Sequence, residues 1–183
     1  MPRAKERLRD AAVELSVARG YDSVTVAEIT EYAGLTRRTF SRYFTDKRDV
    51  FFAGSEQLAA AAGAAVADVD ADLGHWDAVV TALREVGQQL VQLVPTAAQR
   101  RIVVRASPEL QERERTKFAL VAAEIAAALE KRGAPASLAG VLGEVGATVF
   151  RAAFDRWLDD PEKVDFATRF DAALAELASC LGS

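Results

Sequence analysis

Little in this sequence provides the chemistry of an enzyme or a metalloprotein. Its 183 residues include one cysteine, Cys180, and one histidine, His75. Two such residues cannot build a Ser–His–Asp triad or a zinc cluster, and the sequence has no glycine-rich phosphate loop. We therefore expect a protein that is not an enzyme and that holds neither a metal nor a cofactor. A lone cysteine cannot form an internal disulfide, which favours a reducing, cytoplasmic location.

Long apolar runs are also missing. The longest, residues 58–67, is mostly alanine and is too short to span a bilayer. Residues 1–6 lack the apolar core of a signal peptide. Half of all residues are hydrophobic and 27% are charged, which is typical of a globular chain and not of a disordered one. We expect no contact with a membrane.

Charge is unevenly distributed along the chain. Residues 1–49 hold ten basic and eight acidic residues, a net charge of +2, whereas the remainder carries −6. The densest stretch is 34–52, GLTRRTFSRYFTDKRDVFF, which combines five basic groups with five aromatic rings. A basic region on an acidic protein indicates a part that meets an anion.

The sequence contains no alternating strand pattern of useful length, and alanine, leucine, glutamate and arginine dominate it. Apolar residues recur instead at the spacing of amphipathic helices. We expect an all-α protein with about nine helices, separated by glycines and by prolines 95, 108, 135 and 161. The expected helices are 4–19, 26–33, 37–44, 46–69, 76–93, 97–106, 109–132, 137–158 and 164–181.

Capping residues fix the ends of the first helices. Gly20 should end the first helix in a left-handed conformation. Thr25 and Glu28 form a capping-box pattern at the start of the second. Thr36 should cap the third helix, and Asp46 the fourth.

Two helices joined by a tight turn at Gly34 are typical of a helix-turn-helix, whose second helix enters a major groove. Leu35, Phe40 and Phe44 should point into a small core. A helix of about eight residues is about 12 Å long, which matches the width of a major groove. The residues left on the outer face are Arg37, Arg38, Ser41 and Arg42.

A charged helix face is more often simply solvated, and that interpretation stays open from the pattern alone. The arginines nevertheless share one face directly after a tight turn, which favours contact with guanine edges or phosphates. Thr36, Thr39 and Tyr43 can offer hydroxyls to the DNA backbone. Lys47 starts the next helix, where backbone N–H groups also favour phosphate.

The segment 25–51, TVAEITEYAGLTRRTFSRYFTDKRDVF, resembles the DNA-binding domain of the TetR family of bacterial transcriptional regulators. The resemblance covers about a seventh of the chain. It implies a DNA-binding domain over 1–48 and a ligand-binding and dimerisation domain over 49–183. The residues that it implies at the DNA are Thr25, Thr36, Arg37, Arg38, Thr39, Arg42, Tyr43 and Lys47.

Two positions depart from the family pattern. Ser41 stands where the family usually has a tyrosine that reaches phosphate, so this contact should be shortened or lost. Thr30 stands where a small alanine is usual in the second helix, a minor packing change. Neither departure breaks the resemblance.

The resemblance further implies a homodimer formed by two helices from each subunit. Helix 137–158 is apolar on more than one side and carries a strip of small residues, Gly140, Gly143 and Ala147, that would allow another helix to approach closely. Helix 164–181 carries a single apolar stripe. We expect dimerisation through these two helices; the alternative is that their apolar residues only fill the core of one chain.

The candidate ligand pocket is apolar, which indicates an apolar ligand. Ordinary core positions are the alternative for each of its residues. The candidates are Phe52, Leu83, Val86, Leu90, Ile102, Phe118, Val121, Ala122, Ile125, Phe150 and Phe154.

Arg100, Arg101 and Arg105 form a basic cluster on helix 97–106. One interpretation is a solvated face or salt bridges with Glu109 and Glu112. The other is an anion site for an acidic or phosphorylated ligand. The surrounding segment resembles TetR members with an acyl-CoA-type ligand domain, which implies acyl-CoA as a candidate effector.

The leading hypothesis is therefore a ligand-responsive repressor. A dimer would place two short helices in successive major grooves about 34 Å apart, on a palindromic operator. A small apolar or acyl-type ligand would favour a spacing that no longer matches the DNA, with helix 46–69 as the lever. The alternative is a helical scaffold whose helix-turn-helix serves protein contacts, and it would predict an interrupted or acidic third helix.

Overall fold

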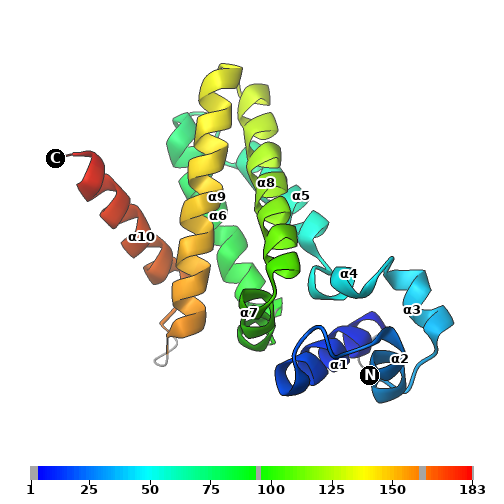
Figure 1. The fold of residues 1–183 in the computed structure, drawn as a ribbon. Helices are drawn as coiled ribbons and strands as arrows, with labels where there is room; N and C mark the ends of the chain where they lie inside the picture. The colour runs from blue at the N-terminus through cyan, green and yellow to red at the C-terminus, as the bar shows by residue number, and fades with distance from the viewer. Residues whose placement is uncertain (1–3, 94–95, 161–163, 183) are drawn as a thin grey trace. The chain divides into compact units, whose positions relative to one another are not determined.

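A computed structural model describes residues 4–93, 96–160 and 164–182. The described residues form ten α-helices and no β-strand (Figure 1). The expected all-α class is therefore confirmed. Prolines 95 and 161, which were expected to separate helices, lie outside the described residues.

Most helices begin and end within about two residues of the expected positions, because their amphipathic pattern and caps are local signals. The exception is the fourth expected helix, which is split in two. The ten helices are α1 (Ala4–Arg19), α2 (Val26–Tyr32), α3 (Arg37–Tyr43), α4 (Lys47–Phe51), α5 (Ser55–Asp68), α6 (His75–Leu93), α7 (Ala97–Ala106), α8 (Pro108–Lys131), α9 (Ala136–Asp159) and α10 (Phe166–Leu181).

The caps expected from the sequence are present. Gly20 has a φ of 83° and Gly34 a φ of 62°, the left-handed conformation that glycine adopts without strain. The Thr25 hydroxyl oxygen accepts a hydrogen bond from the backbone N–H of Glu28, and the Glu28 carboxylate accepts one from the backbone N–H of Thr25. Thr36 and Asp46 cap α3 and α4 through their side chains.

The expectation of one continuous helix over 46–69 was wrong. The helical conformation ends at Phe51, Phe52 has φ −114° and ψ 15°, and Gly54 has φ 95°. Helix resumes at Ser55. The turn buries Phe51 and Phe52, neighbours in sequence, in one core. Only glycine adopts the Gly54 conformation readily, so the break is encoded at that residue.

By its contacts the chain divides into two compact units. We call Met1–Gly54 with Thr96–Arg115 the head unit, and Ser55–Pro95 with Thr116–Ser183 the body unit. Helix α8 starts in the head unit and continues into the body unit. The expected domain boundary after residue 48 stays a prediction, because a division by contacts is not a division by function.

The core of the head unit needs residues from beyond the helix-turn-helix. It gathers residues of α1 to α4 around Leu8, Ile29 and Phe51, each at most 2% exposed. Helix α7 packs against α1. Val104 of α7 and Leu110 of α8 are fully buried in the same core. Burying these side chains stabilises the head by the hydrophobic effect.

The body unit is built on α6, α9 and α10, which pack against one another, together with α5 and the later part of α8 (Figure 1). A Cβ on Gly143 would lie 2.4 Å from the carbonyl oxygen of Ala122, so the close approach expected at this glycine is present and involves α8. No atom lies within 4 Å of a Cβ on Gly140. By length and composition alone α9 is apolar enough to cross a membrane, but its buried residues belong to the body core.

Candidate nucleic-acid interface

Helix α3 has one anchored face and one exposed face. Phe40 and Phe44 are 3% and 5% exposed, and their ring centroids lie 5.4 Å apart in the head core. Leu35 packs against the same core. The aromatic side chains of this segment are thus core residues, as expected, and they fix which face of α3 looks outward.

The exposed face of α3 carries the predicted arginines. Arg37, Arg38, Ser41 and Arg42 are exposed. Among the residues that the structure describes, Arg37 and Arg38 have no hydrogen-bond or ion-pair partner. Each guanidinium carries five N–H donors in a fork that fits the acceptor edge of guanine or a phosphate. Both groups are therefore available to an external acceptor.

Arg42 is held in place by its neighbour. Its Nη2 donates a hydrogen bond of 2.9 Å to the Tyr43 hydroxyl, and the guanidinium carbon lies 4.7 Å from the centre of the Tyr43 ring. A cation over an aromatic face is attracted by the ring quadrupole. The Arg42 side chain is therefore oriented in advance and keeps further N–H donors for a ligand.

The hydroxyls at the start of α3 already serve the helix. Thr36 Oγ1 accepts a hydrogen bond of 3.1 Å from the Thr39 backbone, and the two threonine hydroxyls lie 3.0 Å apart. One of the two hydroxyls donates to the other, so the second O–H group is left to donate to a phosphate oxygen. In α2, the Thr30 hydroxyl donates to the Ala27 carbonyl at 2.8 Å, which satisfies a side chain that is only 4% exposed.

Thr25 is engaged in the capping box. Its hydroxyl donates to Glu28 Oε2 at 2.7 Å, and Arg19 forms an ion pair of 2.9 Å with Glu28 Oε1. The hydrogen bonds from Thr25 and then the Arg19 guanidinium lower the pKa of Glu28 to about 2. Thr25 thus fixes the start of α2, whatever contact it makes with phosphate.

Lys47 has a role that the sequence did not indicate. Its ammonium donates to the carbonyl oxygens of Tyr21 at 2.8 Å and Val24 at 3.0 Å, and lies 3.9 Å from the centre of the Tyr21 ring. An ammonium has three donors, and the two carbonyl oxygens use two of them. These two hydrogen bonds connect the loop between α1 and α2 to the start of α4. Such partners, more than twenty residues away, leave no local sequence signal.

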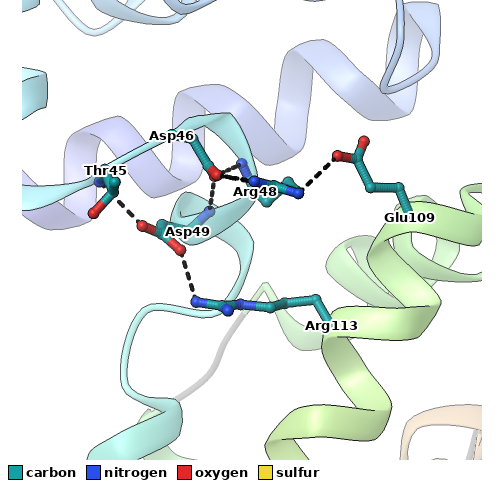
Figure 2. Close-up of polar contacts among 6 residues, drawn as sticks. All are labelled: Thr45, Asp46, Arg48, Asp49, Glu109 and Arg113. Carbon is teal, nitrogen blue, oxygen red and sulfur yellow. Dashed lines mark hydrogen bonds and ion pairs between the residues drawn. The ribbon is translucent and has the colours of Figure 1, made fainter.

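The predicted Asp46 cap of α4 is part of a larger polar network, whose ion pairs with α8 the sequence did not indicate (Figure 2). Asp46 Oδ1 accepts the backbone N–H groups of Arg48 at 2.8 Å and Asp49 at 3.1 Å. Arg48 Nη1 lies 3.2 Å from Glu109 Oε1, and Arg113 Nη2 lies 2.9 Å from Asp49 Oδ1. The hydrogen bond from Arg48 lowers the pKa of Asp46. These pairs link α4 to the first turns of α8.

Tyr21 completes the surroundings of α4. Its side chain is buried, and its ring packs edge-on to Phe51 with centroids 5.6 Å apart. Burial, and then the charge and hydrogen bond of Glu109, raise the pKa of the Tyr21 hydroxyl. Glu109 therefore faces both a phenol and a guanidinium of the head unit.

The basic cluster on α7 has partners in the head unit. Arg100 Nε donates to the Phe51 carbonyl at 2.5 Å, and Arg100 Nη2 pairs with Glu114 at 3.0 Å. Arg101 is 8% exposed, and it and Arg105 also make interactions. The interpretation of Arg100 as a salt-bridged residue is favoured, although its acid is Glu114 and neither of the two expected ones.

The predicted ligand-pocket residues do not all lie in one unit. Phe52 and Ile102 belong to the head unit, where Ile102 is 60% exposed, and the other nine belong to the body unit. Phe150 is 1% exposed, and its ring packs against the Phe166 ring with centroids 5.4 Å apart. None of the eleven lines either of the two body-unit cavities described below, so their role in binding stays a prediction.

Two cavities are described within the body unit. The larger, of about 580 Å³, lies between α6, α9 and α10; its lining residues are Trp76, Asp77, Val80, Leu142, Val145, Leu174, Ala175, Leu177, Ala178 and Leu181. The smaller, of about 330 Å³, is more polar, with Gln88, Gln92 and Asp165 in its wall. Among the described residues no cluster of three His, Cys, Asp or Glu side chains has the geometry of a metal site.

Two protein-family models match the chain. Residues 8–54 match the model of bacterial regulatory proteins of the tetR family, and residues 73–182 match the model of the MftR C-terminal domain. Together the two matches cover most of the sequence. The chain belongs to the TetR family. A comparison with curated protein sequences finds no match.

Solved structures of TetR-family proteins share the fold. A candidate TetR-family regulator from Syntrophomonas wolfei is 12% identical, with a TM-score of 0.67 over 98% of this chain and 95% of that one. FadR from Bacillus subtilis, in complex with stearoyl-CoA, is 16% identical, with a TM-score of 0.59 over 93% of this chain and 95% of that one. FadR from Thermus thermophilus, a repressor in complex with lauroyl-CoA, is 24% identical, with a TM-score of 0.51 over 95% of this chain and 93% of that one. At such identities the similarity shows the fold alone.

As a TetR-family protein, the chain is a DNA-binding transcriptional regulator and not an enzyme. The helix-turn-helix of the family is the pair α2 and α3. Its second helix is the one that presents Arg37, Arg38 and Arg42 to solvent.

Proposed function

We propose that this TetR-family regulator is a homodimeric repressor that reads a palindromic operator with the exposed face of α3 and leaves it when an acyl-type ligand binds. The observation that carries the proposal is the exposed arginine face of α3, which lies opposite its buried aromatic face. Two arginines without partners among the described residues stand on one face, while Phe40 and Phe44 fix the opposite face in the core. Such a face supplies charge-assisted donors at the spacing of base edges and phosphates.

Dimerisation is supported by apolar surface on α9 and α10. Leu138 is 41% exposed, Val141 60% and Leu181 79%. The larger cavity, of about 580 Å³, includes Leu181 in its wall and is lined mainly by apolar side chains of α9, α10 and α6. Exposed apolar patches of this kind mark protein interfaces. A second copy of the chain is the proposed partner, and the two α3 helices would then enter major grooves about 34 Å apart.

The ligand class is proposed from two considerations. Two structural neighbours named FadR, from Bacillus subtilis and Thermus thermophilus, are complexes with stearoyl-CoA and lauroyl-CoA. The residues predicted to line the pocket in this chain are apolar, which suits an acyl chain. A ligand can release DNA only to the extent that it binds the released conformation more tightly than the DNA-bound one. The protein would act where the chromosome lies, in the cytoplasm.

The test of the proposal is selection of bound sequences from a random pool of double-stranded DNA by the purified protein at a stated salt concentration. A dimeric reader should enrich a palindrome, because two equal α3 helices meet two equal half-sites. Lauroyl-CoA and stearoyl-CoA are then titrated against that complex. Enrichment of no sequence by folded protein would contradict sequence reading, and a complex that both ligands leave intact would contradict the acyl ligand.

A further inference from the structure

Helix α4 is a short element held from two sides. On one side Lys47 binds two carbonyl oxygens of the loop between α1 and α2. On the other, Arg48 and Asp49 form ion pairs with residues of α8. The helix then ends at the turn 52–54, so no continuous helix runs from it into α5. The lever expected from the sequence is therefore interrupted.

Helix α8 is the long continuous element of this region. Its 24 residues begin in the head unit, where Leu110 is fully buried. They continue into the body unit, where Ile125 and Leu129 are fully buried in the body core. Along an α-helix each backbone N–H is bonded to the preceding turn, which makes the helix stiff. One helix thus has its two ends packed in different cores.

The two ion pairs between α4 and α8 have opposite charge order: one has its base on α4, the other has its base on α8. Arg48, a base on α4, pairs with Glu109, an acid on α8, at 3.2 Å; Asp49, an acid on α4, pairs with Arg113, a base on α8, at 2.9 Å. Glu109 and Arg113 are one turn apart on α8. A shift of α8 by one turn would bring Arg113 towards Arg48, and like charges repel. The charge order therefore fixes the register of the two helices.

Asp49 also connects this register to α3. Its Oδ2 accepts the backbone N–H of Thr45 at 3.0 Å, and Thr45 directly follows Phe44, the C-cap of α3 (Figure 2). Arg113, Asp49 and Thr45 thus form a hydrogen-bonded path of two steps from α8 to the end of α3. The charged side chains of both ion pairs are partly exposed, at 23% to 51%. Pairs of this exposure contribute little to folding stability, so their main effect is on position.

We propose that Glu109 and Arg113 are positioning residues for DNA binding, which hold α4, and through Asp49 and Thr45 the exposed face of α3, in register. Both residues lie more than 60 residues after the helix-turn-helix, in the first turns of a helix that continues into the body unit. This inference deepens the proposed function and rests on it for the DNA that α3 binds.

The test uses the full chain with Glu109→Gln and Arg113→Gln combined. One acid and one base are removed together, so the net charge and the non-specific attraction to DNA stay the same. The dissociation constant for the selected palindrome should rise about fivefold, the lower end of a typical coupling between sites. Amide hydrogen exchange in α3 and α4 should become faster, because a lost contact lowers the local opening energy.

Two further variants complete the test. Glu112→Gln with Arg115→Gln removes an ion pair within α8 with the same change of charge, and should leave both readouts near wild type. Glu109→Asp with Arg113→Lys keeps both charges and should restore the dissociation constant to within about twofold, because the ion pairs persist at lower geometric quality.

The outcomes separate the inference from the proposed function. If the wild type binds a palindrome and the Glu109→Gln/Arg113→Gln variant binds it equally well, the inference is wrong and the function stands. If the wild type enriches no palindrome, the proposed function is wrong. Unchanged amide hydrogen exchange in α3 and α4 of the Glu109→Gln/Arg113→Gln variant would then overturn the inference as well. Faster exchange in these helices would support their positioning by α8.

Discussion

Arg42 differs from Arg37 and Arg38 in having a partner beside it. The Tyr43 hydroxyl accepts its hydrogen bond, and the Tyr43 ring lies under the guanidinium. The sequence identified all three arginines as a set, because it shows which face they share. It could not show which of them is held before DNA arrives, since this depends on side-chain conformation.

A Tyr43→Phe variant tests the orientation of Arg42. It keeps the ring and removes only the hydroxyl that holds the guanidinium, so the operator affinity should fall by about 1 kcal/mol, or roughly fivefold. A fluorescence anisotropy titration with operator DNA measures this affinity. The matched control is Tyr32→Phe, which removes another exposed hydroxyl, bonded to Glu14 at 2.9 Å, on α2. Equal affinities of the two variants would contradict a role for the Tyr43 hydroxyl.

Glu28 predicts a pH dependence of head stability. Its pKa is lowered from 4.5 to about 2 in the folded chain, by Thr25 and then Arg19. A group with a depressed folded pKa stabilises the fold above its unfolded pKa, and this contribution is lost as the pH falls through the folded value. The melting temperature of wild type should therefore fall faster between pH 4.5 and 2 than that of Glu28→Gln. Parallel curves for the two proteins would argue against the capping-box carboxylate as the cause.

At the scale of elements, the sequence predicted what local chemistry determines. The caps at Thr25, Thr36 and Asp46 involve partners two or three residues away, and all three are present. The break at residues 52–54 was missed, because a single glycine such as Gly54 is also tolerated inside a helix, and only the core that buries Phe52, assembled from distant segments, decides for the turn. The contacts of Lys47 and Arg113 were missed for the same reason.

Gly54 is the residue on which the break between α4 and α5 depends. Its φ of 95° is strained for any residue with a Cβ, so Gly54→Ala should destabilise the protein by at least about 1 kcal/mol. Gly140→Ala is the comparison, since this glycine lies inside α9 with open space where a Cβ would stand, and it should gain about 0.5–1 kcal/mol. Urea unfolding measures both. A stabilised Gly54→Ala protein would indicate a continuous helix at 52–54.

At the scale of the whole molecule, the head unit is completed by residues that follow it by more than 40 positions. The sequence located the helix-turn-helix but assigned α7 and all of α8 to the second domain. By contacts, Thr96–Arg115 group with the head, while the functional boundary after residue 48 stays a prediction. Buried Val103, Val104 and Leu110 explain this grouping, because their side chains fill the head core.

Leu110→Ala tests this composition of the head. The side chain is fully buried, so its truncation should cost about 2–4 kcal/mol of unfolding free energy. Leu120→Ala, also on α8 but at a position 45% exposed, should change stability by about 0.5 kcal/mol or less. Exchange of the α1 and α3 amides reports which unit is affected. Unchanged protection there in Leu110→Ala would mean that the head core does not depend on α8.

The proposed reading of DNA by the exposed face of α3 is tested by the operator affinity of a double variant. The dissociation constant of Arg37→Ala/Arg38→Ala for the selected operator is compared with that of Arg115→Ala/Lys131→Ala, which removes two exposed positive charges from α8. Each lost base contact is worth about 1–3 kcal/mol. The α3 variant should therefore bind the operator at least tenfold more weakly than the control, with an unchanged melting temperature. Equal operator affinities of the two folded variants would contradict the assignment of α3 as the DNA-reading helix.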